Sequence, residues 1–476
     1  MLRNDSVKMQ ILSKEKREKI AQAGKQILND LGVRICSPTV YNLLVDAGAV
    51  PDKTRSDILR FPSGMVDKYL AMCPNHFTIT DRAGNVSNIA SGSPPLYYTS
   101  NAVTYQRGST RTVCDIGKQD LTDFVQVVNQ LENIHGVVGT SIKEYPPTAR
   151  DFAGFALMAQ YTYKHLRPCI YTPAGAEAII EMADVILMGK PLREHMFFTL
   201  GYSIVSPLTW SETALSLFEK TKGHGIPIMI NSEPMAGGTS PVTMAGSLVQ
   251  ADAEVISGIV INQVLEPGRP CVYNAGFAHV MDMMTMIVLT GAPENALLQA
   301  AGAEMAAHHG LPCASWALSD APMMDLQSSY EKLFTLLSHT LSNVNMIWGV
   351  GNIETSKTIS PEIAVIDNEM IGSCLRFTRG IEVDAKHLAL DVILEAGFEG
   401  NYLETEHTLT HYQKEIRHSR LTNRLNRAQW EGKGSKSMED KAKETVDNIL
   451  RQKPECYLSG AQIDKLENIK KKRMYK

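Results

Sequence analysis

The residues best suited to ligand chemistry are aromatic and amide side chains at the ends of short apolar runs. They include Tyr171, Tyr202, Asn231, Trp316 and Trp348. Histidine and lysine are scarce at these positions, although proton transfer and phosphoryl transfer usually need histidine, paired carboxylates or a Gly-Lys phosphate cradle. Aromatic faces instead suit a cation that has no proton to donate, because each cation–π contact contributes about 0.5 to 2 kcal/mol. The pattern favours a quaternary ammonium ligand; core packing is the alternative for each aromatic residue.

The predicted binding pocket combines aromatic residues from several parts of the chain. Its members are Tyr97, Tyr98, Tyr171, Tyr202, Phe277, Trp316 and Trp348. Tyr97 and Tyr98 come from a different predicted segment than the others, so packing between domains is the alternative for this pair.

A small-residue loop after one apolar run is the second candidate. The run ends in the polar residues Asn231 and Glu233, and Gly237 and Gly238 would let the backbone approach a ligand closely. Ser240, followed by a proline, is predicted to cap the next helix. Exposed N–H groups at such a helix start favour an anion, for example a carboxylate. A well-capped loop without a ligand is the alternative.

Two histidines have the spacing of metal ligands. His407 and His411 would share one face of a helix. However, no glutamate follows His407 as in the H-E-x-x-H motif, and no cysteine nearby completes a ligand set. We therefore predict that the chain binds no metal.

Composition excludes several classes of protein. The 476 residues include 47 Lys plus Arg and 51 Asp plus Glu, a net charge of −4, so no basic footprint for nucleic acid is present. No run of about 18 apolar residues is present, which predicts no membrane span, and the N-terminus lacks the apolar core of a secretory signal. The eight dispersed cysteines form no C-x-x-C pair, which indicates free thiols and a cytoplasmic location.

The elements that position these residues alternate between β-rich apolar runs and helical segments. The runs are 137–141, 168–172, 196–202, 227–231, 270–274, 312–316 and 344–349. Four of them start at a proline (Pro168, Pro227, Pro270 and Pro312), which predicts that these four prolines share one end of a sheet. Runs that are apolar nearly throughout are typical of parallel strands covered on both faces.

The repeat predicts an α/β protein built as a (β/α)8 TIM-type barrel, with 363–367 as the eighth strand. We expect N-terminal helices and a small β meander in 1–135, the barrel in 136–384, and a C-terminal helical extension with a charged tail in 385–476. An open doubly wound sheet is the alternative architecture, which the absence of Gly-x-Gly-x-x-Gly after a first strand makes less favourable.

Four ordered blocks resemble the trimethylamine methyltransferase superfamily over roughly residues 14 to 430. The blocks are Met-Ala-Gly-Gly-Thr-Ser-Pro-Val-Thr-Met-Ala-Gly at 235–246, Asp-x-Gln-x-x-Tyr-Glu at 325–331, Ile-Asp-Asn-Glu at 366–369, and His-Thr-Leu-Thr-His-Tyr at 407–412. The resemblance implies a (β/α)8 barrel that passes a methyl group from a methylated amine to the Co(I) corrinoid of a separate carrier protein. The founding members use pyrrolysine, and this sequence has no non-standard residue. It looks like the non-pyrrolysine branch, whose substrates are quaternary amines such as glycine betaine, proline betaine, carnitine and γ-butyrobetaine.

The chemistry of a quaternary amine limits what the residues must do. A quaternary ammonium leaves as a neutral amine, so the protein needs only to hold the methyl in line with cobalt. We expect Glu233 and Asn231 to position that methyl, and Gly237, Gly238 and His407 to join the aromatic residues in the pocket.

No motif of the Asp-x-His-x-x-Gly kind anchors cobalamin in this chain. We therefore expect no cofactor on the chain itself, a corrinoid protein as partner, and a homo-oligomer. Two alternatives stay open. One is a non-catalytic scaffold that binds betaine or the corrinoid partner. The other is a barrel lyase or hydrolase acting on a small acid, with His407 or Glu233 as general base.

Overall fold

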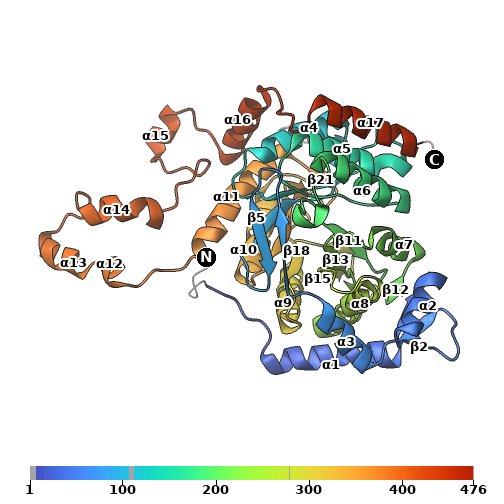
Figure 1. Ribbon diagram of the computed structural model, residues 1–476. Coiled ribbons are helices and arrows are strands. Elements are labelled where there is room, and N and C mark those ends of the chain that lie inside the picture. The colour runs from blue at the N-terminus through green and yellow to red at the C-terminus, as the bar shows by residue number, and fades with distance from the viewer. Residues whose placement is uncertain (1–6, 107–111, 278, 475–476) are drawn as a thin grey trace.

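Eight parallel strands close into a barrel at the centre of the computed structural model, which describes residues 7–106, 112–277 and 279–474 (Figure 1). In chain order the barrel strands are β6 (Leu96–Thr99), β9 (Gly136–Val138), β10 (His165–Arg167), β11 (Leu200–Ser203), β13 (Ile228–Asn231), β15 (Cys271–Gly276), β18 (Cys313–Trp316) and β19 (Met346–Val350). β6 pairs with both β9 and β19, and a bridge between Leu166 and Phe198 closes the remaining gap beside β11. The predicted TIM-type barrel is confirmed.

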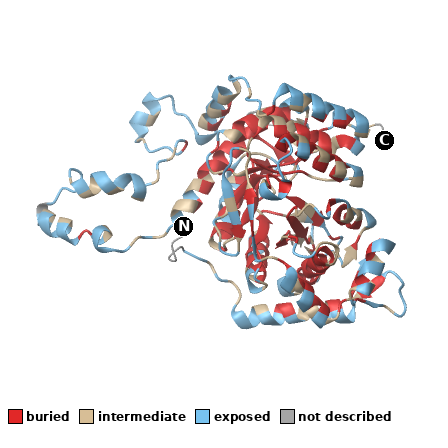
Figure 2. Ribbon diagram, in the orientation of Figure 1, coloured by how far each residue is buried: buried red, intermediate tan, exposed pale blue. Residues whose placement is uncertain are grey.

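One helix follows each strand and covers the barrel from outside. These helices are α4 (Lys118–Asn129), α5 (Arg150–Tyr161), α6 (Pro173–Leu187), α7 (Glu212–Thr221), α8 (Met244–Leu265), α9 (Pro293–His308), α10 (Leu326–Leu341) and α11 (Pro361–Thr378). The strands are thus buried between helices and barrel interior, as Figure 2 shows. This double burial explains why their sequences are apolar nearly throughout.

The predicted eighth strand was wrong. Residues 363–367 lie in α11, where Ile363, Ala364 and Val365 are buried in the helix layer. A short buried apolar run cannot be assigned to strand or helix from periodicity alone. The missing strand is β6, which the sequence pattern placed in a β meander and which lies upstream of residue 136.

The proline prediction was wrong at one position. Pro227, Pro270 and Pro312 directly precede β13, β15 and β18, but Pro168 directly follows β10. The run 168–172 was read as a strand because the real strand, His-Leu-Arg, contains two polar residues. As a consequence, Cys169 and Tyr171 lie at the carboxyl end of the barrel, where barrel proteins build their sites.

The N-terminal segment covers one side of the helix layer. Helices α1 (Lys14–Asp30), α2 (Pro38–Asp46) and α3 (Ser63–Met72) pack on α8, and α1 also packs on α9. Small sheets accompany them. Their strands are β1 (Val33–Ile35), β2 (Val50–Pro51), β3 (Ile58–Arg60) and β12 (Thr209–Trp210) in one sheet, β4 (His76–Thr80) and β5 (Val86–Ala90) in a hairpin, β7 (Thr104–Gln106), β8 (Val113–Asp115), β20 (Asn352–Ile353) and β21 (Thr358–Ile359) in a third, and β14 (Met235–Ala236), β16 (His279–Asp282) and β17 (Ile287–Leu289) in a fourth.

The C-terminal extension is helical and has two parts. α16 (Met438–Leu450) packs on α4 and α11, while α17 (Gly460–Met474) packs on α5 and α6, where Arg473 pairs with Glu177 and Glu181 at 3.0 Å each. Between α11 and α16, helices α12 (Ala385–Leu388), α13 (Leu390–Ala396), α14 (Glu406–Glu415) and α15 (Arg427–Gly432) project away from the barrel (Figure 1).

Among the described residues, α8 is the one helix that is long and apolar enough to cross a membrane. Most of it is buried inside the protein, beneath α1 and α3. Its composition is that of a helix in the core of a barrel, which must be apolar on several faces.

A buried ion pair joins α10 to α11 beneath the carboxyl ends of the strands. Lys332 Nζ lies 2.9 Å from Asp367 Oδ2, and Gly351 N–H also donates to this oxygen, at 2.7 Å. We predict that Asp367→Leu lowers the free energy of unfolding by about 3–5 kcal/mol, because it leaves the Lys332 charge buried without its partner.

The control for this prediction is the double variant Lys332→Met/Asp367→Leu, which removes both charges. Urea denaturation should find the double variant more stable than Asp367→Leu alone. Equal losses in the two variants would contradict the explanation by an unpaired charge.

Candidate functional site

The candidate site is the barrel interior at the carboxyl ends of the strands. Alternate residues of each strand point inward, and their neighbours contact the helix layer. The inward side chains of this layer include Arg167, Ser203, Asn231, Asn274, Trp316 and Trp348, each from a different strand. One half of the interior is therefore aromatic and the other half polar.

The aromatic half brings together three residues predicted for the pocket. The ring centroid of Phe277 lies 3.8 Å from that of Trp316 and 5.2 Å from that of Trp348. His279 lies beside them, with its ring centroid 6.1 Å from that of Trp316. Burial lowers the pKa of His279 to about 4, so this imidazole is neutral at pH 7 and adds no positive charge to the aromatic wall.

The polar half is built around Arg167, which sequence reasoning missed. The guanidinium lies over the ring of Trp348, with Cζ 4.2 Å from the ring centroid. Among the described residues its hydrogen-bond acceptors are sulfur atoms, Met229 Sδ at 3.4 Å from Nε and Cys169 Sγ at 4.0 Å from Nη1, and it forms no ion pair within 4.0 Å. Burial lowers the pKa of Arg167. A buried cation with weak sulfur acceptors retains capacity to bind an anion.

Space for this guanidinium comes from a glycine on the neighbouring strand. A Cβ on Gly201 would stand 2.3 Å from Arg167 Nη2, so a larger residue there would displace the arginine. The contact with Arg167 also changes the role that we assign to Trp348. It was predicted to bind ligand, but one of its faces is occupied by Arg167, which makes Trp348 the support of the arginine.

Asn231 and Glu233 lie beside Arg167. Asn231 donates to Ser203 Oγ at 3.3 Å and accepts from Asn274 Nδ2 at 2.8 Å. Burial raises the pKa of Glu233 to about 7, and the charge of Arg167 together with a hydrogen bond from Ser203 opposes the shift. At neutral pH this carboxyl group is therefore divided between its two protonation states.

Three of the predicted tyrosines lie away from this layer. The Tyr97 hydroxyl contacts Thr340 of α10 at 2.8 Å, and the Tyr202 hydroxyl contacts Thr221 of α7 at 2.8 Å, so both point out into the helix layer. Tyr98 points inward but bonds to His165 Nδ1 at 3.2 Å, near the amino ends of the strands. These three residues pack in the core, the alternative named for each.

Tyr171 lies at the rim of the site and is 45% exposed. The backbone N–H groups of Tyr171 and Thr172 donate to Asp151 Oδ2 at 3.3 and 3.2 Å, which ties the rim to α5. Cys169, in the same loop, donates to the carbonyl of Gly139 at 3.3 Å, and burial raises the pKa of its thiol. The tyrosine ring thus borders the entrance to the polar half.

The loop at 235–243 does not form the predicted anion site. The N–H groups of Gly238, Thr239 and Ser240 all donate to the carbonyl of Met235, and that of Gly237 donates to the carbonyl of Ser240. The prediction that these donors hold an anion was wrong, because a tight turn already uses them. Nor does Ser240 cap α8, which begins at Met244.

The two glycines of this loop meet methionines instead. Gly237 has a φ of +93°, and a Cβ there would lie 2.8 Å from Met283 Sδ; a Cβ on Gly238 would lie 2.5 Å from Met281 Cε. Both contacts are with β16 or the turn after it, so the glycines allow this hairpin to pack closely on the loop.

His407 lies on α14, in the projecting part of the C-terminal extension (Figure 1). Its ring centroid is 4.5 Å from that of His411, which in turn is 5.0 Å from that of His387. His407 therefore does not join the aromatic residues of the barrel within this chain.

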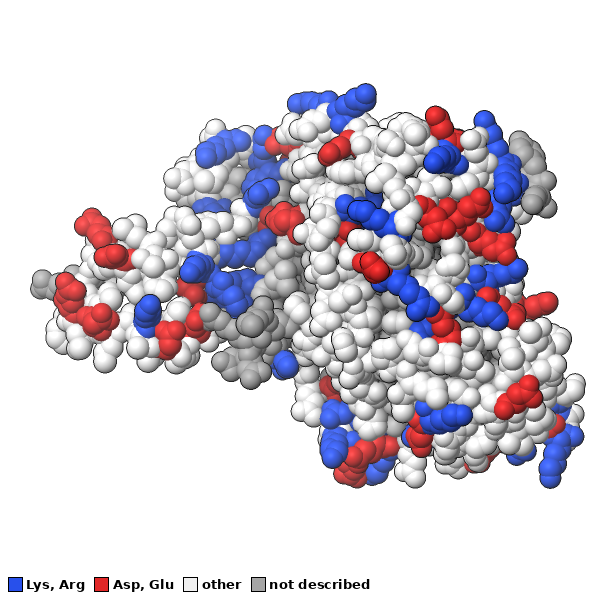
Figure 3. Space-filling view, in the orientation of Figure 1, with Lys and Arg blue, Asp and Glu red and all other residues white. Residues whose placement is uncertain are grey.

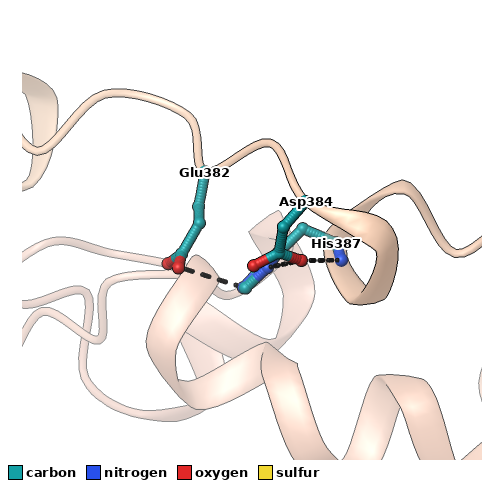
Figure 4. A group of neighbouring side chains, drawn as sticks. All are labelled: Glu382, Asp384 and His387. Carbon is teal, nitrogen blue, oxygen red and sulfur yellow. Dashed lines mark hydrogen bonds and ion pairs between the residues drawn. The ribbon is translucent and has the colours of Figure 1, made fainter. Parts of the chain in front are cut away.

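His387 also belongs to a charged group with Glu382 and Asp384, whose donor atoms lie within 4.8 Å of one another (Figure 4). His387 Nδ1 is 2.7 Å from Asp384 and Nε2 is 3.5 Å from Glu382. Hydrogen bonds from His387 lower the pKa of Asp384 to about 2. Asp384 also accepts from the first N–H groups of α12. The group stabilises the start of that helix, and the absence of a bound metal stays a prediction.

The signal that could have found Arg167 is its place before a proline. Pro168 follows Arg167 directly, and a residue before proline favours extended backbone. Read as the last residue of a strand, Arg167 would have been assigned to the carboxyl end of the barrel. Reading the proline as the first residue of a strand moved the whole element by three residues.

The fold and this interior define the molecule as a TIM-type barrel with a mixed aromatic and polar site at its strand ends. The family model for trimethylamine methyltransferase (MTTB) matches residues 1–476, so the chain belongs to that family, whose members are methyltransferases.

Curated relatives match over most of their length. Trimethylamine methyltransferase MttB of Methanosarcina barkeri is 28% identical over 468 residues, which cover 94% of this chain and 92% of the relative. Glycine betaine methyltransferase of Desulfitobacterium hafniense is 26% identical over 427 residues, which cover 88% of this chain and 87% of the relative. Monomethylamine methyltransferase (MtmB) of Methanosarcina barkeri has a similar structure, with a TM-score of 0.55, 13% identity and coverage of 97% of this chain and 89% of that one, which supports the fold alone.

The balance between Glu233 and Arg167 yields a prediction about ionisation. The guanidinium favours the charged form of Glu233, so Arg167→Met should raise the pKa of Glu233 further above 7. Infrared difference spectra of the protonated carboxyl band should show the shift, with Glu233→Gln identifying the band. A pKa that stays the same or falls in Arg167→Met would show that the two groups are not electrostatically coupled.

Proposed function

We propose that the protein transfers a methyl group from a betaine, a small molecule with a quaternary ammonium and a carboxylate, to the Co(I) corrinoid of a partner protein. Proline betaine and glycine betaine are the foremost candidates, and carnitine and γ-butyrobetaine belong to the same class. One observation carries the proposal: a single barrel interior holds an aromatic wall and, beside it, a buried guanidinium with no carboxylate of the described residues at ion-pairing distance.

The aromatic wall suits the ammonium end of such a substrate. Trp316 is only partly buried, and its ring attracts a cation without hydrogen bonds, which a quaternary nitrogen cannot form. Phe277 packs against this ring, with the two centroids 3.8 Å apart. Because Phe277 is almost fully buried, the wall also excludes water from the methyl groups. A dry wall of this kind holds the cation without solvating it so strongly that loss of its charge becomes difficult.

Arg167 suits the carboxylate end. A guanidinium can bind a carboxylate through two parallel N–H···O bonds, and both partners are then charged. Trp348 fixes the plane of the guanidinium from one side, and Gly201 leaves room on the other. This assignment moves the predicted carboxylate site from the 235–243 loop to the strand end of β10.

The methyl transfer then requires mainly that the protein position the methyl group of the substrate. As the methyl–nitrogen bond breaks, its electron pair stays on nitrogen and a neutral tertiary amine leaves. Co(I) provides the pair for the new cobalt–carbon bond, so the corrinoid is a substrate carried by the partner and becomes methyl-Co(III). No proton moves, so no general acid is needed. The tasks of this chain are to orient the methyl toward the open end of the barrel and to exclude water, with Asn231 and Glu233 as positioning residues.

The comparisons support this substrate class in part. One relative is named for glycine betaine, and this chain carries no pyrrolysine, the residue that the resemblance ties to trimethylamine. The eight free cysteines support a cytoplasmic location.

A lyase or hydrolase acting on a small acid is the second candidate. It is favoured by Glu233, whose pKa of about 7 suits a general base. His407 is no longer a candidate for that role in this chain's own site, because it lies outside the barrel.

The function is tested by incubating the protein with reduced cobalamin, or with a reduced corrinoid protein, and each betaine, and following methylcobalamin by its spectrum. Glycine betaine should be used far better than choline, which has the same ammonium head but no carboxylate. Arg167→Met should weaken use of betaine by about 10- to 100-fold, the value of a lost charge-assisted hydrogen bond, and leave use of choline unchanged.

Calorimetric titration of betaine and choline separates binding from turnover. Binding of betaine without methyl transfer would favour a scaffold. Transfer to an acceptor with no preference between betaine and choline would contradict the role of Arg167 but not the methyltransferase. Formation of product from a small acid without a corrinoid would favour the lyase.

A second variant tests the aromatic wall. Trp316→Ala should raise the KM for betaine or lower kcat by roughly tenfold, because one cation–π face and its packing are lost. Tyr202→Phe is the matched control, since its hydroxyl points to α7 and its removal should leave betaine kinetics unchanged. Unchanged kinetics in a folded Trp316→Ala variant would remove this residue from the site.

A further inference from the structure

The C-terminal extension contains a segment that a single copy of the chain does not stabilise. We call residues 381–416, which include α12, α13 and α14, the arm. These helices have 4, 7 and 10 residues and contain no buried residue. Isolated helices shorter than about 12–15 residues are marginal in water, and most helices in proteins are held by the packing of an apolar face. The arm therefore needs a surface to pack on.

Most of the arm is exposed (Figure 2), and large apolar residues are among the exposed ones along its length. They are Ile381, Val383, Leu388, Leu390, Ile393, Leu394, Phe398, Tyr402, Leu403, Leu409, Tyr412 and Ile416. Leu394 is 72% exposed and Leu403 79%. Contiguous exposed apolar surface of this kind marks an interface. Because the arm projects from the barrel (Figure 1), its own chain does not cover it.

A second unpartnered apolar surface lies on the barrel. The outer side of α10 carries Leu326, Tyr330, Leu333 and Phe334, at the spacing of one helix face. Their exposed fractions range from 43% for Leu333 to 88% for Leu326. The exposed face of another barrel helix, α7, is polar, with Glu212, Thr213 and Lys220. The apolar face of α10 is therefore not a general feature of the outer helices.

Charged residues are also distributed unevenly along the extension, with an acidic stretch followed by a basic one. The sequence from 382 to 406 contains one lysine, Lys386, and seven acidic residues (Glu382, Asp384, Asp391, Glu395, Glu399, Glu404 and Glu406). The following stretch, 417–436, carries Arg417, Arg420, Arg424, Arg427, Lys433 and Lys436 against Glu431. Figure 3 shows acidic side chains along the arm and basic ones where it joins the body.

One chain thus carries both halves of two complementary pairs, apolar with apolar and acidic with basic. Self-complementarity is the requirement of a two-fold symmetric interface, in which each copy contributes the same surfaces. We infer that the arm binds a second copy of this chain, with the arm of one copy lying on α10 and the basic stretch of the other, and the reverse contact made at the same time.

The test measures mass in solution by light scattering and sedimentation. The full-length protein should be a dimer or a higher even multiple. Leu394→Glu/Phe398→Glu in the arm and Tyr330→Glu/Phe334→Glu on α10 should each weaken self-association by at least about tenfold, since they place charges in an apolar interface. Val86→Glu, at a position 66% exposed on the β4–β5 hairpin, is the matched control and should leave the mass unchanged. Circular dichroism checks that each variant is folded.

Mixing the two variants gives a second readout. A mixed pair keeps one wild-type arm facing one wild-type α10, so the mixture should associate more tightly than either variant alone. A wild-type monomer at micromolar concentration, or a multimer that neither variant weakens, would overturn the inference. A monomer whose variants lose only the response to a corrinoid protein would assign these surfaces to that partner and overturn it equally.

Discussion

The burial of one guanidinium inside a closed barrel is the constraint on which the site depends. Arg167 has no carboxylate at ion-pairing distance among the described residues, so its charge is supported by the face of Trp348 and by two sulfur atoms. Such partners hold a cation without neutralising it. The neighbouring residues fit this buried charge. Gly201 in the next strand leaves space for it, Glu233 stays partly protonated beside it, and the amides of Asn231 and Asn274 bond to each other.

The same constraint explains why the site is divided into two halves. An aromatic wall alone would bind any small organic cation, and an arginine alone would bind any small anion. In the function that we propose, the two together select a molecule that has both charges at a fixed separation. Selection by the pair is sharper than by either charge, since a ligand lacking one of them leaves a buried group unsatisfied. Under that proposal, the aromatic and the polar half of the site together discriminate by the length of the ligand as well as by its charge.

Much of the barrel could be predicted from the sequence, because six of the eight buried strands retain a clear apolar pattern. The errors arose where the pattern was ambiguous. Residues 363–367 are as apolar as a strand but lie in α11, and β6 was hidden next to a hairpin that it does not join. Near the site, Asn231 and Trp316 end their strands and Glu233 follows β13 closely, as the sequence pattern indicated, and Phe277 directly follows β15. Tyr97 and Tyr202 were not, since facing inward or outward depends on strand register, which a single sequence does not fix.

The pairing of β6 with β19 has a consequence for the order in which the chain can fold. Tyr97 and Ile347 are neighbours in the barrel but are far apart in sequence, so β6 leaves the ribosome long before its second partner is made. Until then, β6 has an open edge with unpaired backbone groups that could pair with another chain. Helix α1 likewise lacks its packing partners, α8 and α9, until those helices have been synthesised. The N-terminal part of the nascent chain, up to β6, therefore cannot complete its packing until β19 emerges. A chaperone is most needed during that interval.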